Sequence, residues 1–319
     1  MNELVSVIMS TYNEETDMVE KSIESILNQS YINIEFIIIL DNPENLRLKK
    51  LLYQYESYDQ RVKVFVNDKN LGLVKSLNVA LKQCSGRYIA RMDADDISIS
   101  ERLMTQKEYL ENNKLDFVFS SMILIDENGN KLYETNKDEL SYTDVKKVLE
   151  KGNISTHPTW FLKREVYEEL DGYREVLYCE DYDFTLRCLL KGFKIGKVNQ
   201  SLLMYRIRSN SISRSNSFEQ YRNSIGILKL YKENSLDDMN LVFDIVKKSQ
   251  SKAELKVKER FMIADKKFRK GIENIRNKQI INGLVNIFYS FFISKYYTQK
   301  NIKIILYKIR KYTNFSIIK

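Results

Sequence analysis

Tyr88-Ile89-Ala90-Arg91-Met92-Asp93-Ala94-Asp95-Asp96 is the stretch that decides the fold, because an apolar strand pattern ends there in three carboxylates within four residues. Carboxylates this close repel one another unless a cation or hydrogen-bond donors neutralise them. Oxygen ligands of this kind suit a hard divalent ion such as Mg²⁺ or Mn²⁺. The competing interpretation is an acidic turn that caps the following helix, since Asp is favoured at N-caps and in turns.

The residues before this stretch alternate between apolar, β-branched runs and segments with helical spacing. Residues 34–40 are almost wholly apolar, as expected for a strand covered on both faces, and Asp41-Asn42-Pro43 ends the run. The order of the segments predicts a mostly parallel sheet with helices on both faces. The strands are expected at 5–9, 34–40, 62–66 and 87–92, and the helices at 16–29, 45–58 and 73–84.

Three polar loops follow strands of this predicted sheet, at residues 11–14, 41–42 and 93–96. In such sheets ligands bind beyond the carboxyl ends of the strands, where loops converge. We therefore expect the acidic stretch to belong to a binding site. No Gly-x-Gly-x-x-Gly or P-loop pattern occurs in the chain, so phosphate is expected to be held by metal and side chains.

The residues after the acidic stretch predict further mixed structure and then a helical region. Asp126-Glu127-Asn128-Gly129-Asn130 is a strong hairpin signal between two apolar runs. Helices are expected near 101–113 and 142–151, strands near 116–124 and 130–134, and mainly helix after residue 220. We expect two parts, residues 1–220 as an α/β domain and residues 221–319 as a helical, basic extension.

The composition indicates an intracellular globular protein. Three cysteines without metal-type spacing (Cys84, Cys179 and Cys188) predict free thiols in a reducing compartment. The N-terminus lacks the pattern of a signal peptide, and no apolar run reaches the roughly 18–20 residues that span a bilayer. A cytoplasmic location is therefore expected.

Charge is concentrated at the C-terminal end, and this suggests an anionic partner for that region. Residues 251–319 carry 17 Lys and Arg against 4 Asp and Glu, whereas the preceding residues have a slight acidic excess. Residues 280–293 are apolar but too short to span a membrane. Further on, Ile302, Ile305, Leu306 and Ile309 line one helix face among lysines. This pattern predicts a peripheral anchor on the anionic inner leaflet, and the alternative is packing on the catalytic domain or in a homo-oligomer. Nucleic acid is not expected, because no recognition module is present.

Several motifs, in this order, carry a resemblance over roughly residues 4–215. They are Ser6-Val7-Ile8-Met9-Ser10-Thr11-Tyr12-Asn13-Glu14, Ser22-Ile23-Glu24-Ser25-Ile26-Leu27-Asn28-Gln29-Ser30, Asn70-Leu71-Gly72-Leu73, the acidic stretch, and Glu180-Asp181. The chain resembles the family 2 glycosyltransferases, whose GT-A fold binds nucleotide sugars. The resemblance implies a GT-A catalytic domain over 1–220, a UDP-sugar donor and a saccharide acceptor.

The resemblance also implies roles for individual residues. Asp95 matches the direct ligand of a divalent cation, and Asp93 lies nearer the ribose or in the metal shell. Asp181 matches the catalytic base that takes the proton of the acceptor hydroxyl, and Glu180 orients the acceptor or supports Asp181. The nucleotide-sugar side is expected to include Thr11, Tyr12, Asn13, Glu14, Asp41, Asn70, Gly72, Lys75, Asn78 and Arg91.

Two positions depart from the family pattern. Leu40-Asp41 has one acid where many relatives have two, and Arg208 stands where many relatives carry His, which puts a metal or phosphate role of its loop in doubt. Contacts with acceptor or diphosphate are considered for His157, Trp160, Asp96, Arg206 and Arg208, against a structural hydrogen bond for His157 and a core position for Trp160.

The function expected from this pattern is transfer of a hexose or N-acetylhexosamine from a UDP-sugar to a lipid-linked saccharide in surface polysaccharide synthesis. Attack from the face opposite the leaving group inverts the anomeric centre, so an α-linked donor gives a β-linked product. Two alternatives remain: a nucleotidyltransferase, which normally has a phosphate loop near its first strand, and a non-catalytic, membrane-associated nucleotide-binding adaptor.

Overall fold

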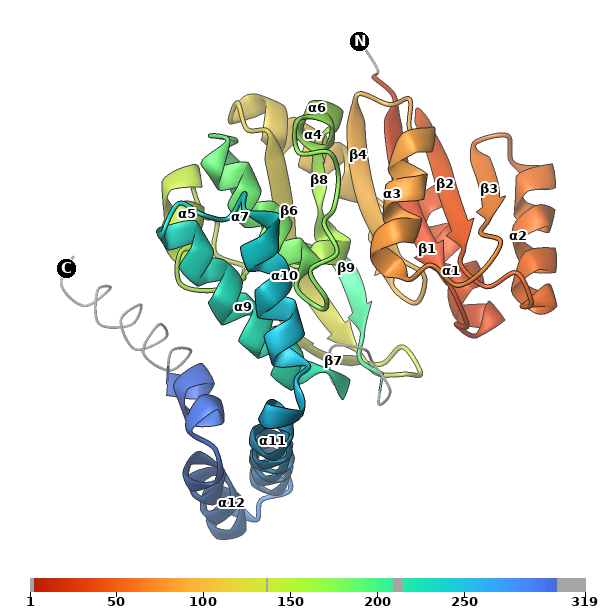
Figure 1. Ribbon diagram of the computed structural model, residues 1–319. Helices are drawn as coiled ribbons and strands as arrows, with labels where there is room; N and C mark the ends of the chain where they lie inside the picture. Colours follow the sequence, from red (N-terminus) through yellow and green to blue (C-terminus); the bar gives the residue numbers. More distant parts are fainter. Residues whose placement is uncertain (1–2, 136, 209–214, 303–319) are drawn as a thin grey trace, which may run out of the picture.

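The computed structural model describes residues 3–135, 137–208 and 215–302, and within them a nine-stranded sheet forms the centre of the molecule (Figure 1). The strand order is β3-β2-β1-β4-β8-β6-β9-β5, with β7 paired to β6. The first four strands pair in parallel: β1 (Val5–Thr11), β2 (Ile34–Leu40), β3 (Val62–Val66) and β4 (Tyr88–Asp93). This parallel part confirms the expected strand positions.

The other half of the sheet is mixed. A short strand, β8, lies antiparallel between β4 and β6. Strand β9 runs parallel to β6 and also pairs with β5. The predicted hairpin is formed by β6 and β7. The bounds are β5 (Ile97–Ser98), β6 (Phe117–Ile125), β7 (Lys131–Glu134), β8 (Phe161–Lys163) and β9 (Ile195–Arg206). Strands β5, β8 and β9 were not predicted. β5 and β8 have only two and three residues, too few to produce a periodic signal, and β9 is interrupted by polar residues.

Helices cover both faces of the sheet, because the central strands are apolar on both sides. In β2, Phe36, Ile38 and Leu40 belong to one core while Ile37 and Ile39 belong to the other. The first core packs under α1 (Thr16–Leu27), α2 (Leu46–Tyr58) and α4 (Arg102–Asn112). The second packs under α3 (Leu73–Gln83), α6 (Arg164–Glu169), α7 (Glu180–Leu190), α9 (Ser217–Lys232) and α10 (Met239–Ser249), with α5 (Tyr142–Leu149) at its edge.

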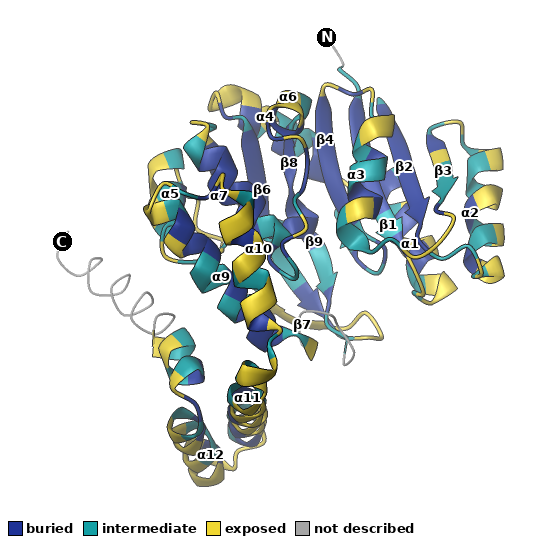
Figure 2. Cartoon of the chain, viewed as in Figure 1, coloured by how far each residue is buried: buried dark blue, intermediate teal, exposed yellow. Residues whose placement is uncertain are grey.

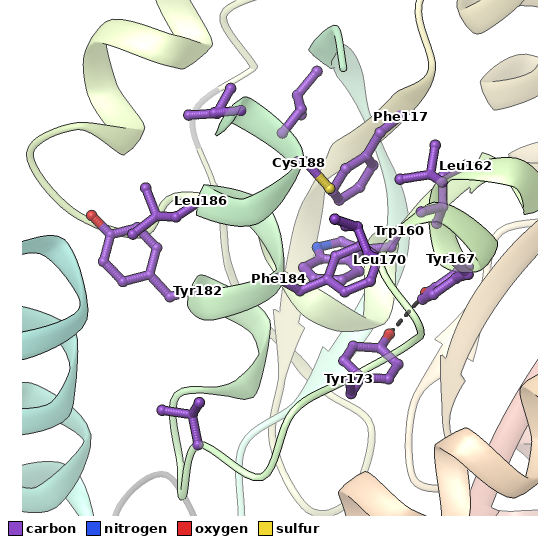
Figure 3. Close-up of a cluster of buried hydrophobic side chains, with 14 of the residues drawn as sticks. Phe117, Trp160, Leu162, Tyr167, Leu170, Tyr173, Tyr182, Phe184, Leu186 and Cys188 are labelled. Atoms are coloured by element: carbon purple, nitrogen blue, oxygen red, sulfur yellow. Dashed lines mark hydrogen bonds between the residues drawn. The ribbon is translucent and has the colours of Figure 1, made fainter. Parts of the chain in front are cut away.

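The aromatic centre of the second core holds the only tryptophan. Figure 3 shows Trp160 among Phe117, Tyr173 and Phe184, with the Tyr167 and Tyr173 hydroxyls hydrogen-bonded at 2.8 Å. Trp160 follows a short 3-10 turn, η1 (His157–Thr159). This core holds the chain leading to α7 against the sheet.

The C-terminal helices form a third, smaller core below the sheet (Figure 1). Phe218 and Tyr221 of α9, Phe261 and Ala264 of α11, and Tyr297 make up its buried residues. Its elements are the turn η2 (Lys252–Glu254), α11 (Leu255–Arg276), α12 (Ile280–Ile293) and the helical residues 295–302. Helix α9 runs across residue 220 without a break. The division into parts 1–220 and 221–319 stays a prediction.

Helices α11 and α12 cross with their backbones almost in contact. A Cβ atom on Gly271 would lie 2.7 Å from the Gly283 carbonyl oxygen, and one on Gly283 would lie 2.7 Å from the Gly271 oxygen. The face of α12 away from α11 is exposed (Figure 2). Within the described ranges, no helix combines the length and hydropathy that crossing a membrane requires. Of the predicted tail helix, Ile305, Leu306 and Ile309 lie outside the described residues.

Candidate active site

The carboxyl ends of β1, β2 and β4 meet at one edge of the sheet, as predicted. Ser10 lies opposite Asp93 in the pairing of β1 with β4, and Thr11 lies opposite Leu40 of β2. The Glu14 carboxylate accepts hydrogen bonds of 2.7 Å from the Thr11 hydroxyl and from the Tyr12 backbone N–H. The loop after β1 is therefore closed on itself, which leaves the Tyr12 ring exposed at 41%.

A second contact ties this loop to the one after β2. The Asn42 amide donates to the Asn13 side-chain oxygen at 2.7 Å, and the Asn45 amide donates to the Tyr12 carbonyl and to Asn13 at 3.3 Å. Asn45 also caps α2 by accepting from the Leu48 backbone N–H. Thus, the predicted Tyr12 and Asn13 lie on a fixed polar rim.

Asp41 is almost fully buried, and its carboxylate organises the loop before α3. It accepts from the Asn67 amide at 2.7 Å and from the backbone N–H groups of Leu71 and Gly72 at 2.8 Å each. Asn70 accepts from the same Gly72 N–H, and Gly72 has a φ of 83°, which a glycine adopts without strain. In the structure Asp41 holds the loop before α3 in shape. Its contact with the nucleotide sugar stays a prediction.

Two more residues that were predicted to contact the nucleotide sugar lie on α3, and both contact the loop that leads to α7. Asn78 accepts from the Tyr173 N–H at 2.9 Å and donates to the Tyr173 carbonyl at 2.8 Å. Lys75 pairs with Glu175 at 3.2 Å. Their predicted role at the nucleoside stays a prediction, and what the contacts establish is a bridge between α3 and the loop before α7.

In the acidic turn the three carboxylates have different surroundings. Asp93 forms an ion pair with the buried Arg91. Burial, followed by the negative charges of Asp93 and Glu14, raises the pKa of Asp95 to about 6. Asp96 is fully buried, and burial together with Asp93 and Asp95 raises its pKa well above the usual range. Asp93 and Asp95 are both partly exposed and each lies beside an arginine, Arg91 and Arg208 respectively, whereas Asp96 is closed off from solvent.

The end of β9 holds this turn in place. Asp96 accepts from the Arg206 N–H at 2.8 Å, and the Arg206 guanidinium donates to the Asp95 carbonyl at 2.8 Å and to the carbonyls of Asp126 and Glu127. Arg208 lies 3.3 Å from the Asp95 carboxylate. The Arg206 guanidinium is thereby occupied by backbone oxygens, while Arg208 lies beside the candidate metal ligand. A contact of either arginine with a diphosphate stays a prediction.

A second acidic cluster opens α7, where Glu180 and Asp181 occupy the first turn as expected. The Asp181 carboxylate accepts from the Asn153 amide at 2.8 Å and from the Tyr182 N–H at 2.7 Å. Burial raises the pKa of Asp181 to about 6, and burial followed by the Asp181 charge raises that of Glu180 to about 7. Asp181 is therefore ionised at neutral pH and basic enough to accept a proton.

Asp183, the third acid of α7, was missed from sequence and has a structural role. It is fully buried, and its carboxylate accepts from the Arg187 guanidinium at 2.9 Å and from Arg174 Nε at 3.0 Å. Arg187 also donates to the carbonyls of Leu170 and Gly172. These contacts fix the loop before α7. The spacing of Asp183 and Arg187 on one helix could have suggested their pairing, whereas nothing in the sequence indicates that Arg174 joins them.

Arg91 connects the two acidic clusters electrostatically. It pairs with Asp93, and its positive charge also lowers the pKa values of Glu180 and Asp181 against the larger effect of burial. The Asp93 charge in turn raises the pKa of Glu180. These couplings indicate that the β4 turn and the start of α7 are both within electrostatic range of Arg91.

His157 and Trp160 lie in the interior. The His157 Nε2 atom and the Tyr173 hydroxyl are 2.8 Å apart, and burial followed by Arg91 lowers the His157 pKa well below its usual value. His157 is therefore a neutral hydrogen-bonding group, and its contact with diphosphate stays a prediction. The considered contact of Trp160 with a sugar is wrong, because the ring is 0% exposed and packed on all sides by aromatic residues.

The acidic turn suits a divalent cation that is held partly by its substrate. Within the described residues, no set of three or more His, Cys, Asp or Glu side chains forms a complete metal site. A cation carried by phosphates needs only one or two protein carboxylates. The raised pKa of Asp95, caused partly by Asp93 and Glu14, indicates a local excess of negative charge that such a cation would neutralise.

Solved structures show where this fold occurs. The chain is similar to the crystal structure of Staphylococcus aureus TarS residues 1–349 in complex with UDP-GlcNAc, with a TM-score of 0.59, 21% sequence identity, and coverage of 89% of this chain and 90% of the other. This similarity confirms the GT-A fold that was expected from sequence.

Sequence comparisons identify the family. A 243-residue match to a glycosyltransferase of Methanocaldococcus jannaschii has 37% identity and covers 75% of this chain and 83% of the relative. The Escherichia coli enzyme WfgD, a UDP-Glc:α-D-GlcNAc-diphosphoundecaprenol β-1,3-glucosyltransferase, is 31% identical over 73% of this chain and 88% of its own. The E. coli O-antigen biosynthesis glycosyltransferase WbnJ is 34% identical over 67% of this chain and 83% of its own. The family model for glycosyl transferase family 2 matches residues 6–171. The chain belongs to glycosyl transferase family 2.

Proposed function

We propose that the protein is a divalent-cation-dependent, inverting glycosyltransferase that moves a hexose or N-acetylhexosamine from a UDP-sugar to a hydroxyl of a lipid-linked saccharide. The observation that carries this proposal is the pairing of two acidic clusters through Arg91, one at the end of β4 and one at the start of α7. The carboxylates of one cluster have the negative charge to hold a cation, which in turn would bind the diphosphate. The other has a carboxylate that can take a proton.

In the proposed reaction, Asp181 removes the proton of the acceptor hydroxyl as its oxygen attacks C1 of the donor sugar. The new O–C1 bond forms while the bond from C1 to the β-phosphate oxygen breaks, and UDP leaves with the electron pair. Asn153 and the Tyr182 N–H hold the Asp181 carboxylate in one orientation. Attack opposite the leaving group turns an α-linked donor into a β-linked product.

Asp95, with Asp93 beside it, would hold the cation, and a bound Mg²⁺ or Mn²⁺ would stabilise the charge of the leaving diphosphate. Arg91 neutralises Asp93 and so limits repulsion between the acidic turn and a polyanionic donor. The rim formed by Thr11, Tyr12, Asn13 and Glu14 lies on the side where the nucleoside is proposed to bind. Glu180 is proposed to orient the acceptor.

The printed names of relatives support the choice of substrates. WfgD is named for UDP-Glc and for an acceptor on diphosphoundecaprenol, WbnJ is named for O-antigen biosynthesis, and the TarS structure contains UDP-GlcNAc. We propose by analogy a UDP-sugar donor and a role in surface polysaccharide synthesis. Membership of this family favours glycosyl transfer over the nucleotidyl transfer considered from sequence.

A panel of UDP-sugars tests the proposal without knowledge of the acceptor. Each is incubated with the protein and Mn²⁺ or Mg²⁺, binding is measured by calorimetry, and slow hydrolysis is measured as release of UDP. At least one UDP-sugar is expected to bind and be hydrolysed, with both effects removed by EDTA. Binding without any hydrolysis or transfer would favour the adaptor instead.

The exposed face of α12 supports a location at the cytoplasmic surface of the cell membrane. The helix has no charged residue, and large apolar side chains on it are more than half exposed: Ile280, Ile281, Leu284, Val285, Phe288, Tyr289 and Phe292. Exposed lysines lie beside it, including Lys267, whose ammonium lies 5.9 Å from the Tyr289 ring centroid. Apolar side chains bordered by lysines fit the surface of an anionic bilayer, where the lipid acceptor would be found.

Co-sedimentation with vesicles tests this location. We expect the protein to bind vesicles of phosphatidylcholine mixed with phosphatidylglycerol more tightly than phosphatidylcholine alone. The double variant Phe288→Ser and Phe292→Ser should lose roughly a hundredfold in affinity, because two aromatic side chains no longer leave water. The matched variant Leu46→Ser and Tyr58→Ser, also exposed but on α2, should bind normally. Equal binding by all three proteins, or a concentration-dependent dimer lost only in the α12 variant, would contradict the lipid assignment.

A further inference from the structure

A cavity of about 330 Å³ lies beside the candidate base. Its wall includes Asp181 and its hydrogen-bond partner Asn153, and α9 forms the opposite side through Ser217, Gln220 and Tyr221. The last contributor is Lys300, from the C-terminal helical residues. The cavity is therefore closed by elements beyond the 6–171 range of the family match, and none of the sequence motifs predicted it.

The position of Lys300 at the cavity is fixed by the third core. Tyr297 is 3% exposed and packs edge-on against Phe261, with ring centroids 5.2 Å apart. Its hydroxyl donates to Asp265 at 3.2 Å. The Asn301 amide donates to the Tyr297 carbonyl at 2.9 Å. The Tyr297 contacts dock residues 295–302 on α11, and the Arg222 guanidinium of α9 lies 4.7 Å from the Tyr296 ring centroid. Lys300 thereby lines the same cavity as Asp181.

The charges at this cavity are unbalanced. Lys151 and Lys300 both line it, and among the described residues neither has a carboxylate within ion-pair distance. The Lys300 ammonium lies over the Phe261 ring, 5.5 Å from its centroid. Burial lowers the Lys300 pKa, and an anion in the cavity would stabilise the charged form of this lysine. Hydroxyl and amide groups from α9 complete a lining suited to a polar, anionic ligand.

We propose that this cavity is the acceptor site, and that Lys151 and Lys300 bind the phosphate that links the acceptor saccharide to its carrier. The inference rests on the proposed function, since it takes Asp181 as the base. A sugar hydroxyl at Asp181 and a phosphate at the two lysines place one end of the acceptor at the reaction and the other toward the C-terminal helices. Charge-assisted hydrogen bonds from lysine to phosphate are among the stronger polar contacts in proteins.

Binding is tested first, with saturating UDP and Mn²⁺ present to fill the donor side. Calorimetry compares geranyl diphosphate with inorganic pyrophosphate. Lys300→Met is expected to weaken binding of geranyl diphosphate about tenfold, and Lys300→Arg should retain most of it. The matched control is Lys295→Met, an exposed lysine of the same helical segment. Tighter binding of the geranyl compound indicates a lipid-borne phosphate, and equal binding indicates a free one. Equal affinity of wild type and Lys300→Met would overturn the inference, whatever the activity.

Transfer is tested next, with two acceptors that carry the same sugar on a prenyl diphosphate or on a neutral alkyl chain. The wild type should favour the diphosphate acceptor by at least about tenfold in kcat/KM. Lys300→Met should lose this preference through a higher KM for the diphosphate acceptor, whereas the control Lys295→Met should keep both the preference and the hydrolysis of the UDP-sugar. A uniform loss on both acceptors would show a merely structural role for Lys300. If no UDP-sugar is turned over by the wild type, the proposed function fails and the binding result alone decides the cavity.

Discussion

The two acidic clusters of this protein have nearly the same composition and different physical surroundings. Each holds three carboxylates within four residues, at 93–96 and at 180–183. In the first, the buried member accepts one backbone N–H from β9 and has a strongly raised pKa. In the second, the buried member is bound by two arginines. Identical side chains thus have either a raised pKa, as in Asp96, or a place in a core ion pair, as in Asp183, according to the donors that surround them.

Replacing the proposed base gives the largest expected effect. Asp181→Asn retains the size of the side chain and loses the proton acceptor, so transfer should fall by about 10²–10⁴-fold while UDP-sugar affinity is unchanged. Steady-state kinetics and calorimetry measure the two quantities. Glu168→Gln, at an exposed acid of α6, is the matched control and should change neither. Retained turnover in Asp181→Asn would rule out its role as base.

The buried acids should differ most in their contribution to folding. Asp183→Ala leaves Arg174 and Arg187 without their carboxylate, and the free energy of unfolding should fall by about 3–5 kcal/mol. Asp96→Asn should cost about 1 kcal/mol, because the site already favours a neutral group and an amide oxygen can still accept from Arg206. Urea denaturation measures both. Equal losses would mean that the two buried acids are equivalent.

Asp95 is expected to govern cation-dependent binding. Asp95→Asn should weaken binding of UDP in the presence of Mn²⁺ by about 10–100-fold and leave binding without metal unchanged. Glu108→Gln, an exposed acid on α4, serves as control. The measurement is calorimetry with and without Mn²⁺. An equal change in both conditions would assign Asp95 to the fold alone.

The pH dependence of UDP binding and of kcat/KM should also distinguish the two clusters, with a smaller effect than the substitutions above. The pKa values of Asp95 and Asp181 are each raised to about 6, so both carboxylates gain protons as the pH falls below 6 and lose function there. Binding of UDP with Mn²⁺ should fall about tenfold per pH unit on the acid side, and kcat/KM about a hundredfold, because it needs both groups ionised. The same slope in both profiles would contradict the assignment of Asp181 as the base.

The sequence was sufficient to locate those strands that form a continuous run of apolar residues. The strand at 34–40 and its neighbours were located because each is a continuous apolar run, and the loops at 41–42 and 93–96 were placed together because parallel strands share an edge. The short β8 was not located, since its position depends on pairing with β4 and β6.

The local surroundings of the site could not be predicted in the same way. Asn153 and Asp183 bind partners from other segments, and nothing in the sequence links Asn153 to Asp181 or Asp183 to Arg174. Trp160 was considered for sugar stacking because aromatic residues do this at exposed sites, and only packing with Phe117 and Phe184 shows that it has no free face.

The crossing of α11 and α12 has a consequence for how this region tolerates change. The two helices approach closely enough that a side chain on Gly271 or Gly283 would collide with the opposite backbone. The outward face of α12 meets no such restriction, so any sufficiently apolar set of residues would fill it equally well. Exchange of one apolar residue for another should therefore be tolerated on the outward face of α12, whereas any side chain at Gly271 or Gly283 would collide with the opposite helix.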